Sequence, residues 1–179
     1  MEFQEFAKIP RLKREIVITE KIDGTNACVV FNDDGTFSHA QSRNRIITPD
    51  NDNYGFAGWV QDNLEDLTKL GPGYHYGEWW GQGVGRGYGL KERRFSLFNT
   101  ARWNDKNPNR PACCHVVPVL EIRAGFDTVG TQLERLRTLG SVAAPGFASP
   151  EGLIVYHCAS RGYFKVTLER DDEWKGKKA

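Results

Sequence analysis

The chain has 179 residues, of which 39% are hydrophobic and 26% are charged. That length suits one domain with its own core, and that composition argues against a disordered chain. No run approaches the ~20 apolar residues that a membrane-spanning helix needs, and the N-terminal residues lack the apolar segment of a signal peptide. Lysine and arginine total 24 against 23 acidic residues, so attraction to nucleic acid must come from local basic patches. We expect a single domain over residues 1–179, without membrane association, in the cytoplasm.

The first seventy residues predict a hairpin followed by a helix. Apolar, β-branched runs at 16–19, 27–31 and 37–41 are interrupted by a turn at Asn32-Asp33-Asp34-Gly35, which is typical of a hairpin. Apolar residues then recur every three to four positions from Phe56 to Leu70, which predicts an amphipathic helix of about four turns. Asp52 or Asn53 is available to cap this helix, and Gly71-Pro72 to end it.

The remaining sequence predicts mainly strands. Strands expected at 74–80 and 95–102 flank a glycine-rich stretch from Gly81 to Gly89, which we interpret as a flexible loop. A further strand is expected at 116–123, and strands at 153–158 and 163–168 close the chain. A second helix is predicted over 128–139, with Gly140 just beyond its last apolar residue. This order favours an α+β domain of mostly antiparallel sheets with a few helices.

The four cysteines, Cys28, Cys113, Cys114 and Cys158, form no CxxC pair, and two adjacent cysteines are awkward partners in a disulfide framework. We expect reduced, mostly buried thiols. Neither the cysteines nor the four histidines have the spacing of a zinc site, so no zinc is expected.

Lys21 is the first candidate for chemistry, because it lies where a strand runs into a turn that Asp23 and Gly24 can make. A lysine amine attacks phosphorus only after losing its proton. A nucleophilic lysine therefore needs neighbouring cations, such as metal ions or other lysines. Taken alone, Lys-x-Asp-Gly fits a surface lysine beside a β-turn equally well.

The segment Lys21-Ile22-Asp23-Gly24-Thr25-Asn26 resembles the nucleotidyl-lysine motif of the superfamily of polynucleotide ligases and mRNA capping enzymes. Five later segments resemble further motifs of that superfamily, in the same order, from about residue 15 to about residue 170. They are Ser42-Arg43-Asn44-Arg45, Tyr76-Gly77-Glu78-Trp79-Trp80-Gly81, Phe95-Ser96-Leu97-Phe98-Asn99, Pro150-Glu151-Gly152-Leu153-Ile154-Val155-Tyr156 and Phe164-Lys165-Val166-Thr167.

The first two motifs imply a covalent centre and a phosphate contact. By resemblance, Lys21 becomes bonded to the nucleotide, Asp23 takes part in catalysis and Asn26 helps bind the nucleotide. Arg43, favoured over Arg45, contacts the nucleotide or a polynucleotide phosphate, for which the planar guanidinium fork is well suited.

The later motifs imply a nucleotide pocket and a metal ligand. Glu78 would accept hydrogen bonds from the ribose hydroxyls, and Phe98 would stack on the purine. Glu151 would help bind a divalent metal, and Lys165 would grip the α-phosphate as a catalytic residue. The chain departs from the family at two positions.

Those two positions are Asn99, where many ligases have aspartate, and Thr167, where the family usually has a second lysine. Lys175, Lys177 and Lys178 could compensate, although a solvated tail explains them better. Beyond the motifs, Arg45, Arg86, Lys91, Arg93 and Arg94 are candidates for contacts with polynucleotide phosphates.

The resemblance implies an ATP-dependent RNA ligase of the nick-sealing type, since asparagine at position 26 is more typical of those enzymes than of DNA ligases. Its cofactors would be ATP and Mg²⁺ or Mn²⁺, and its substrates RNA ends or a nicked duplex, with DNA also possible. The implied fold is a nucleotidyltransferase, ATP-grasp-like ligase adenylation domain. Because only residues 169–179 follow the last motif, we expect no OB-fold.

Three alternatives remain open at this point. A DNA ligase and a GTP-using guanylyltransferase share the lysine chemistry, and stacking on an aromatic ring does not select between purines. A nucleotide- or RNA-binding module with weak catalysis is the third alternative, and Asn99 and Thr167 favour it mildly. The presence of Lys21, Glu78, Glu151 and Lys165 together favours an enzyme.

Overall fold

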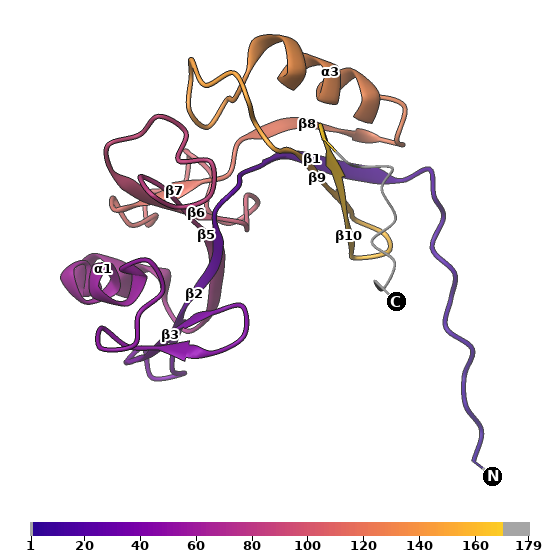
Figure 1. The fold of residues 1–179 in the computed structure, drawn as a ribbon. Helices are drawn as coiled ribbons and strands as arrows, with labels where there is room; N and C mark the ends of the chain where they lie inside the picture. The colour runs from indigo at the N-terminus through magenta and orange to yellow at the C-terminus, as the bar shows by residue number, and fades with distance from the viewer. Residues whose placement is uncertain (1, 170–179) are drawn as a thin grey trace, which may run out of the picture.

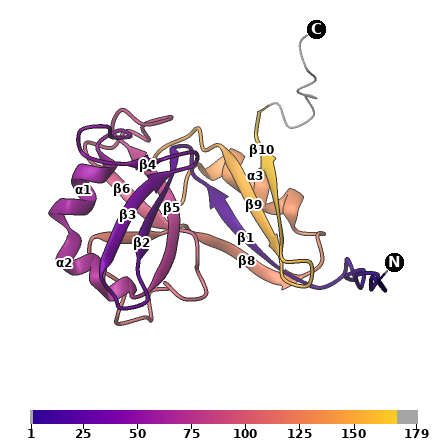
Figure 2. The ribbon, with the colours of Figure 1, turned by 90° about the horizontal axis from the view of Figure 1, so that it is seen from below.

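A computed structural model of the protein describes residues 2–169, and the basic tail at Lys175, Lys177 and Lys178 lies outside this range. The described chain forms two sheets joined by the passage from β1 into β2 (Figure 1). Seen from below, the sheets lie side by side, each with its helices on one side (Figure 2). This confirms an α+β fold of mostly antiparallel sheets.

The smaller sheet has the strand order β10-β9-β1-β8, and every neighbouring pair is antiparallel. Its strands are β1 (Glu15–Lys21), β8 (Val119–Ala124), β9 (Gly152–His157) and β10 (Gly162–Thr167). Helix α3 (Val129–Leu139) covers one face, as Figure 1 shows. Alternate residues of β1 enter the core beneath α3, because neighbouring side chains on a strand point to opposite faces. This core is formed by Ile16, Ile18, Leu136, Leu153 and Val155.

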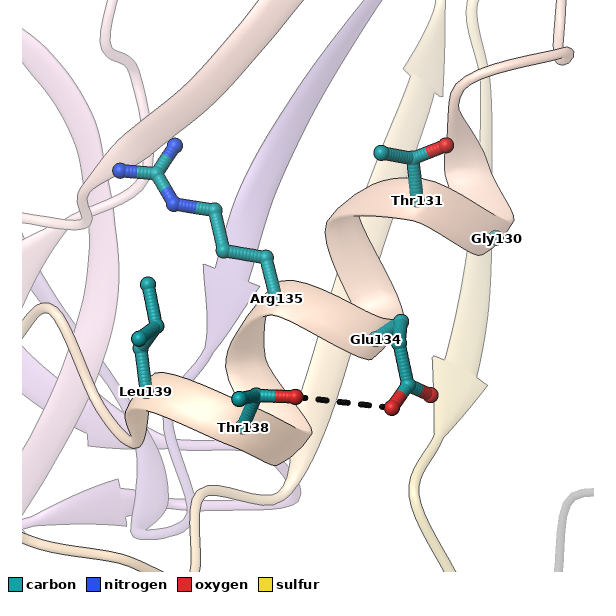
Figure 3. A pocket seen from close by; sticks show the side chains of 6 residues that line it. All are labelled: Gly130, Thr131, Glu134, Arg135, Thr138 and Leu139. Atoms are coloured by element: carbon teal, nitrogen blue, oxygen red, sulfur yellow. Dashed lines mark hydrogen bonds between the residues drawn. The ribbon is translucent and has the colours of Figure 1, made fainter.

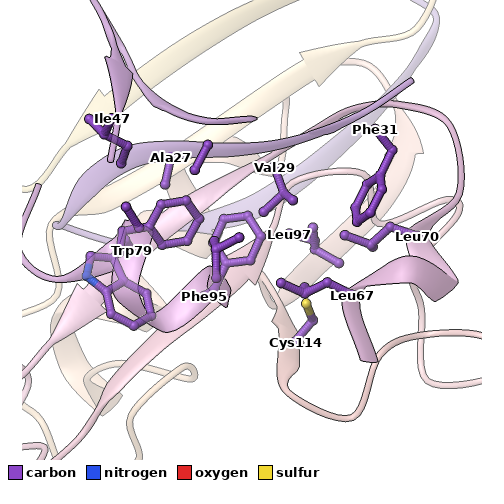
Figure 4. Packing of buried hydrophobic residues seen from close by; sticks show 14 of the residues in the cluster. Ala27, Val29, Phe31, Ile47, Leu67, Leu70, Trp79, Phe95, Leu97 and Cys114 are labelled. Atoms are coloured by element: carbon purple, nitrogen blue, oxygen red, sulfur yellow. The ribbon is translucent and has the colours of Figure 1, made fainter. Parts of the chain in front are cut away.

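The larger sheet has the order β4-β3-β2-β5-β6-β7. Its strands are β2 (Thr25–Phe31), β3 (Phe37–Ser42), β4 (Ile46–Ile47), β5 (Gly73–Gly81), β6 (Arg93–Leu97) and β7 (Cys114–Val116). Among the described strands, β6 and β7 form the one parallel pair. In the main core, Val29, Phe95 and Leu97 of this sheet pack against Leu67 from the helical segment (Figure 4).

The predicted four-turn helix over residues 56–70 is interrupted. The structure has α1 (Phe56–Asp62), α2 (Leu64–Leu67) and a 3₁₀ turn, η1 (Thr68–Leu70). The break occurs at Asn63, whose φ of −113° and ψ of 12° are not helical. The N-cap residue of α1 is Gly55, and not Asp52 or Asn53 as predicted. The Asp52 carboxylate nevertheless accepts hydrogen bonds from the N–H groups of Ala57 at 2.8 Å and Gly58 at 3.0 Å in the first turn.

Two predicted strands are also corrected. The strand expected at 95–102 ends at Leu97, because Asn99 starts a turn in which its carbonyl accepts from the Trp103 N–H at 2.9 Å. The strand expected at 116–123 is divided at Pro118, which has no N–H to donate to a ladder. Its two parts, β7 and β8, belong to different sheets.

The glycine-rich stretch is a folded loop, contrary to the expectation of a flexible one. Val84 is 1% exposed and Tyr88 is 3% exposed, so both side chains are part of the core. Successive turns are closed by hydrogen bonds from the N–H groups of Val84, Gly87 and Leu90 to carbonyls three residues earlier. The loop is therefore held against the protein along much of its length.

All four cysteines are free thiols, and Cys28 and Cys114 are buried. Burial raises the pKa of the Cys28 thiol to about 12, so this group stays protonated at neutral pH. Within residues 2–169, the protein has no helix long and apolar enough to span a membrane.

Candidate active site

Lys21 lies at the end of β1, directly opposite Gly152 of β9. The residue before Gly152 is Glu151, and its carboxylate forms an ion pair with Lys21 Nζ. Both side chains are mostly buried, with 23% of Lys21 and 20% of Glu151 exposed. Glycine is required at position 152, because a Cβ there would lie 2.1 Å from the Val166 carbonyl oxygen. The pairing of β9 with β1 thus brings a carboxylate to the lysine.

Glu78 approaches the same point from the larger sheet. It lies on β5, opposite Asn26 of β2, and its Oε1 accepts a hydrogen bond of 3.1 Å from the Gly24 N–H. Gly24 allows this approach, since a Cβ would lie 2.4 Å from the Trp79 carbonyl oxygen. The turn after Lys21 therefore packs directly on β5.

The pKa of Glu78 is raised to about 7, chiefly because burial disfavours its charged form. The pKa of Glu78 is lowered by the positive charges of Lys21 and Arg43 and by the hydrogen bond from the Gly24 N–H. It is raised further by the negative charge of Glu151. Three other predicted site residues, Lys21, Arg43 and Glu151, thus lie within electrostatic reach of Glu78. Lys21, Arg43, Glu78 and Glu151 thus form one charged cluster at the junction of the sheets.

Lys165 shares a sheet face with Lys21. On β10, Thr167 lies opposite Gly152, which in turn lies opposite Lys21. Lys165 is two positions from Thr167 along the same strand, and residues two apart point to the same face. Lys165 is exposed on that face, as a phosphate contact must be. The Thr167 hydroxyl donates to the Glu169 carbonyl at 2.8 Å.

Phe98 follows directly after β6, where its N–H donates to the Tyr76 carbonyl at 3.0 Å. Its side chain is 39% exposed, in contrast to the buried Phe95 and Leu97. The ring is therefore available to a ligand, beside the strand that carries Glu78.

Glu20 was given no role by sequence reasoning, although it adjoins the lysine. Its carboxylate is 1% exposed and accepts hydrogen bonds from the Ser141 hydroxyl at 2.6 Å and from the N–H groups of Val142 at 2.8 Å and Ala143 at 2.9 Å. A carboxylate is rarely buried without such partners. A signal existed in the sequence, because Glu20 continues the inward alternation of Ile16 and Ile18.

Tyr88 is a second residue that sequence reasoning missed. Its hydroxyl accepts a hydrogen bond of 2.8 Å from the Asp23 N–H. The Asp23 carboxylate lies 3.5 Å from Arg86 Nε. Both partners come from the glycine-rich loop, so this loop contacts the predicted nucleotidyl-lysine turn.

The other predicted polynucleotide-binding arginines also have partners within the chain. Arg45 donates to the carbonyls of Asn51 and Asp52, and Arg93 to those of Tyr54 and Gln82. Arg94 pairs with Glu92 and lies over the Trp80 ring. Their contacts with polynucleotide stay a prediction.

Within residues 2–169, no group of three or more His, Cys, Asp or Glu side chains gathers to hold a metal ion. A shallow surface hollow lies on α3 (Figure 3). Because α3 covers the face of β1 opposite to Lys21, this hollow is separate from the charged cluster. It is lined by Gly130, Thr131, Glu134, Arg135, Thr138 and Leu139.

The structure thus brings Lys21, Glu78 and Glu151, which come from three of the motif segments, to the junction of the two sheets. A family model described as RNA ligase matches residues 14–167. The protein therefore belongs to the RNA ligase family. No curated protein sequence matches the chain.

Solved structures of RNA ligase from Naegleria gruberi have the same fold. One substituted form with ATP and Mn has a TM-score of 0.65 at 20% identity, over 88% of this chain and 51% of that chain. Another, without ligand, has a TM-score of 0.64 at 21% identity, over 87% of this chain and 50% of that chain. The protein thus spans about half the length of these Naegleria chains.

Proposed function

We propose that the protein is an ATP-dependent RNA ligase that works through a Lys21–AMP intermediate. Membership of the RNA ligase family supports RNA as the substrate. The Naegleria structures with ATP and Mn support ATP and a divalent cation as cofactors. The observation that carries the proposal is the cluster in which Lys21 contacts Glu151 and lies near Glu78.

In the first step, Lys21 Nζ attacks the α-phosphorus of ATP, and the bond to pyrophosphate breaks as the N–P bond forms. Because the amine is held in an ion pair with Glu151, it attacks only after this pair opens and its proton passes to solvent. Lys165, on the same sheet face, balances the negative charge on the phosphate. Glu78 accepts from the ribose hydroxyls, Arg43 contacts a phosphate, and Phe98 stacks on the base.

When bound, Mg²⁺ or Mn²⁺ would supply positive charge to neutralise the phosphates of ATP. The residues present fit such an ion, since Mg²⁺ is commonly held through one or two carboxylates together with substrate phosphates and water. Glu151 is the carboxylate that would hold it.

In the second step, an oxygen of the RNA 5′-phosphate attacks the lysine-bound phosphorus. The N–P bond breaks, the amine is restored, and AMP is joined to the 5′ end. In the third step, the 3′-hydroxyl attacks the 5′-phosphorus, AMP leaves, and the hydroxyl proton passes to solvent. We infer that a nicked duplex is the substrate, as in RNA repair, because Asn26 follows Lys21 in the pattern of nick-sealing enzymes.

The first test is the intact mass of the protein after incubation with magnesium and ATP, then with GTP. We expect one AMP per chain in the wild type and none in Lys21→Ala. Lys69→Ala is a matched control, because it also removes a lysine paired with a carboxylate, that of Asp66, but in the helical segment. The control should be labelled like the wild type.

The remaining outcomes separate the alternatives. An adduct with GTP alone would identify a guanylyltransferase, and no adduct with either nucleotide would contradict the ligase proposal and favour a binding module. Sealing of nicked RNA, nicked DNA and single-stranded RNA by the labelled protein then identifies the substrate. A protein that seals only nicked DNA would contradict the RNA assignment.

A further inference from the structure

The glycine-rich loop between β5 and β6 contacts every polar group of Asp23, two residues after Lys21. The Tyr88 hydroxyl accepts from the Asp23 N–H at 2.8 Å. Arg86 Nε lies 3.5 Å from the Asp23 carboxylate. The loop backbone passes so close to the Asp23 carbonyl that a Cβ on Gly85 would lie 2.3 Å from its oxygen. Three nearby loop residues thus surround one residue of the lysine turn.

This part of the loop is itself firmly held. The Tyr88 ring meets the Trp80 ring edge-on, with centroids 4.9 Å apart, and packs on Phe147 at 4.6 Å. Tyr88 has a φ of 53° and Gly85 a φ of 55°, in the left-handed region. Such a conformation in a tyrosine persists only where the surroundings require it.

Phe147 links the loop to a second support. It belongs to the segment 141–147, whose first residues donate the three hydrogen bonds to Glu20. The residue before Lys21 is therefore held by segment 141–147, and Asp23 is held by residues 85–88. The two supports pack on each other through Tyr88 and Phe147. We call residues 85–88 and 141–147 together the lysine clamp.

The lysine clamp contacts Glu20 and Asp23, on either side of Lys21, while the Lys21 amine is paired with Glu151. A lysine side chain has four flexible methylene groups, so the position of its amine depends strongly on how firmly its backbone is held. Correct placement of reacting atoms is worth a large rate factor, and a displacement of about 1 Å can cost ~100-fold. Holding both flanks of Lys21 therefore favours attack on the α-phosphorus.

We propose that Tyr88 and Arg86 are positioning residues for nucleotidyl transfer to Lys21, acting through Asp23. This inference rests on the proposed function. It also gives Arg86 a role different from the predicted contact with polynucleotide, because its guanidinium is engaged with Asp23, the Ser149 carbonyl at 3.2 Å and the Glu169 carboxylate at 3.7 Å.

The decisive variant is Tyr88→Phe, which removes the accepting oxygen and keeps the ring. Single-turnover labelling with ATP gives three quantities: the rate constant at saturation, the ATP concentration at half-saturation, and the fraction of protein labelled. We expect the rate constant to fall by ~10- to 100-fold while the other two stay at wild-type values. A purely structural role would lower the labelled fraction and leave the rate constant of the folded protein unchanged, which would overturn the proposal.

Tyr54→Phe is the matched control, since Tyr54 has a similar left-handed φ of 52° but makes its contacts to Trp79 and Arg93 through its carbonyl. Its labelling rate should equal that of the wild type. A rate equally reduced in both variants would show a general effect of removing tyrosine hydroxyls and would contradict the lysine clamp.

A glycine pair tests the close approach to the Asp23 carbonyl. Gly85→Ala and Gly89→Ala both place alanine in a left-handed conformation, with φ of 55° and 67°. A Cβ at Gly89 meets nothing within 4 Å, whereas one at Gly85 strikes Asp23. The lysine clamp predicts slower labelling in Gly85→Ala than in Gly89→Ala, and equal rates in the two variants would contradict it.

Arg86→Gln separates positioning from polynucleotide binding, because labelling with ATP needs no RNA. A lower labelling rate without RNA supports the lysine clamp. If Arg86→Gln is labelled at the wild-type rate but seals RNA poorly, with a changed dependence on salt, Arg86 instead contacts RNA phosphates.

If the wild type labels normally and Tyr88→Phe labels at the same rate, the lysine clamp is overturned and the proposed function stands. An unlabelled wild type would overturn the proposed function itself.

Discussion

Glu78 is the site residue whose ionisation the fold alters most clearly. Its pKa is raised from an ordinary value of 4.5 to about 7, with burial as the main cause. A carboxylate that accepts from ribose hydroxyls is a better acceptor when charged. Nucleotide binding should therefore strengthen as the pH rises through about 7.

The same shift predicts how stability depends on pH. Between about pH 4.5 and pH 7, folded Glu78 keeps a proton that the unfolded chain has released, so its contribution to stability falls as the pH rises through this window. At ~1.4 kcal/mol per pKa unit, this shift lowers the free energy of unfolding above pH 7 by on the order of 3 kcal/mol. Glu78→Gln keeps an oxygen for the Gly24 N–H but does not ionise. We expect the free energy of unfolding of this variant, measured with urea, to increase relative to that of the wild type as the pH rises from 4.5 to 8.

Glu65→Gln is the control for this pH series, because Glu65 is exposed. Its free energy of unfolding should follow that of the wild type across the range. A difference between Glu78→Gln and wild type that stays constant from pH 4.5 to pH 8 would be incompatible with the raised pKa.

At the residue scale, the chemistry predicted from the sequence is concentrated in short motifs. Glu78 and Glu151 each stand beside a glycine, Lys21 lies three residues before Gly24, and the structure brings the three side chains close together. Glu20 and Tyr88 were missed because their partners are distant. The Glu20 carboxylate meets Ser141, 121 positions away, and Tyr88 meets Asp23, 65 positions away.

At the scale of elements, the helical segment after β4 depends on a side chain that lies outside it. The Asp52 carboxylate accepts from the N–H groups of Ala57 and Gly58 at the start of α1. These groups have no partner within the helix itself. The element is short and interrupted at Asn63, so its start contributes a large part of its local stability.

Asp52→Ala should therefore lower the free energy of unfolding by about 0.5–2 kcal/mol, the range for losing a side-chain acceptor at the start of a helix. Lys21–AMP formation should continue at the wild-type rate in the folded variant, since α1 covers the core face of the larger sheet. Urea unfolding together with labelling by ATP measures both quantities. Asp50→Ala, at an exposed position, is the control. Equal stability of the two variants would show that the hydrogen bonds from Asp52 contribute nothing.

The division of residues 114–124 into two strands shows a limit of local patterns. Apolar residues run through this segment, and from the pattern alone they were interpreted as one strand. Pro118 was visible in the sequence, and its missing N–H marks the break. Assignment of β7 to one sheet and β8 to the other depends on pairing with β6 and β1, which lie far away along the chain.

At the scale of the whole molecule, the buried apolar residues of the described chain form three clusters. One lies under α3, one lies in the larger sheet, and a third, made of Ile22, Trp80, Tyr88, Val117 and Ala144, lies at the junction of the two sheets. The junction cluster includes the residue that follows Lys21. We therefore expect the two sheets to unfold together as one domain.

Leu136→Ala tests this expectation. Leu136 is 1% exposed in the cluster under α3, and its truncation should cost about 2–5 kcal/mol. The tryptophans of the described chain lie in the other two clusters or against them, so tryptophan fluorescence reports on the larger sheet and the junction. If the protein is one cooperative domain, fluorescence and far-UV circular dichroism should record the same unfolding midpoint for Leu136→Ala, lower than that of the wild type.

Leu139→Ala on the same helix is the control, because Leu139 is 70% exposed and its truncation should change the midpoint little. An early step seen by circular dichroism alone, with fluorescence unchanged, would mean two independent units and would refute the single domain predicted over residues 1–179.

The sequence by itself determined the fold class, most of the strands and the candidate chemistry, because strand alternation, helical periodicity and short glycine-bearing motifs are local properties. The tertiary structure alone decided the pairing of Lys21 with Glu151, the folding of the glycine-rich loop onto Asp23, and the burial of Glu20. These features depend on strand register and on packing between residues 65 to 130 positions apart. Local patterns do not encode such contacts, because each depends on how the whole chain packs.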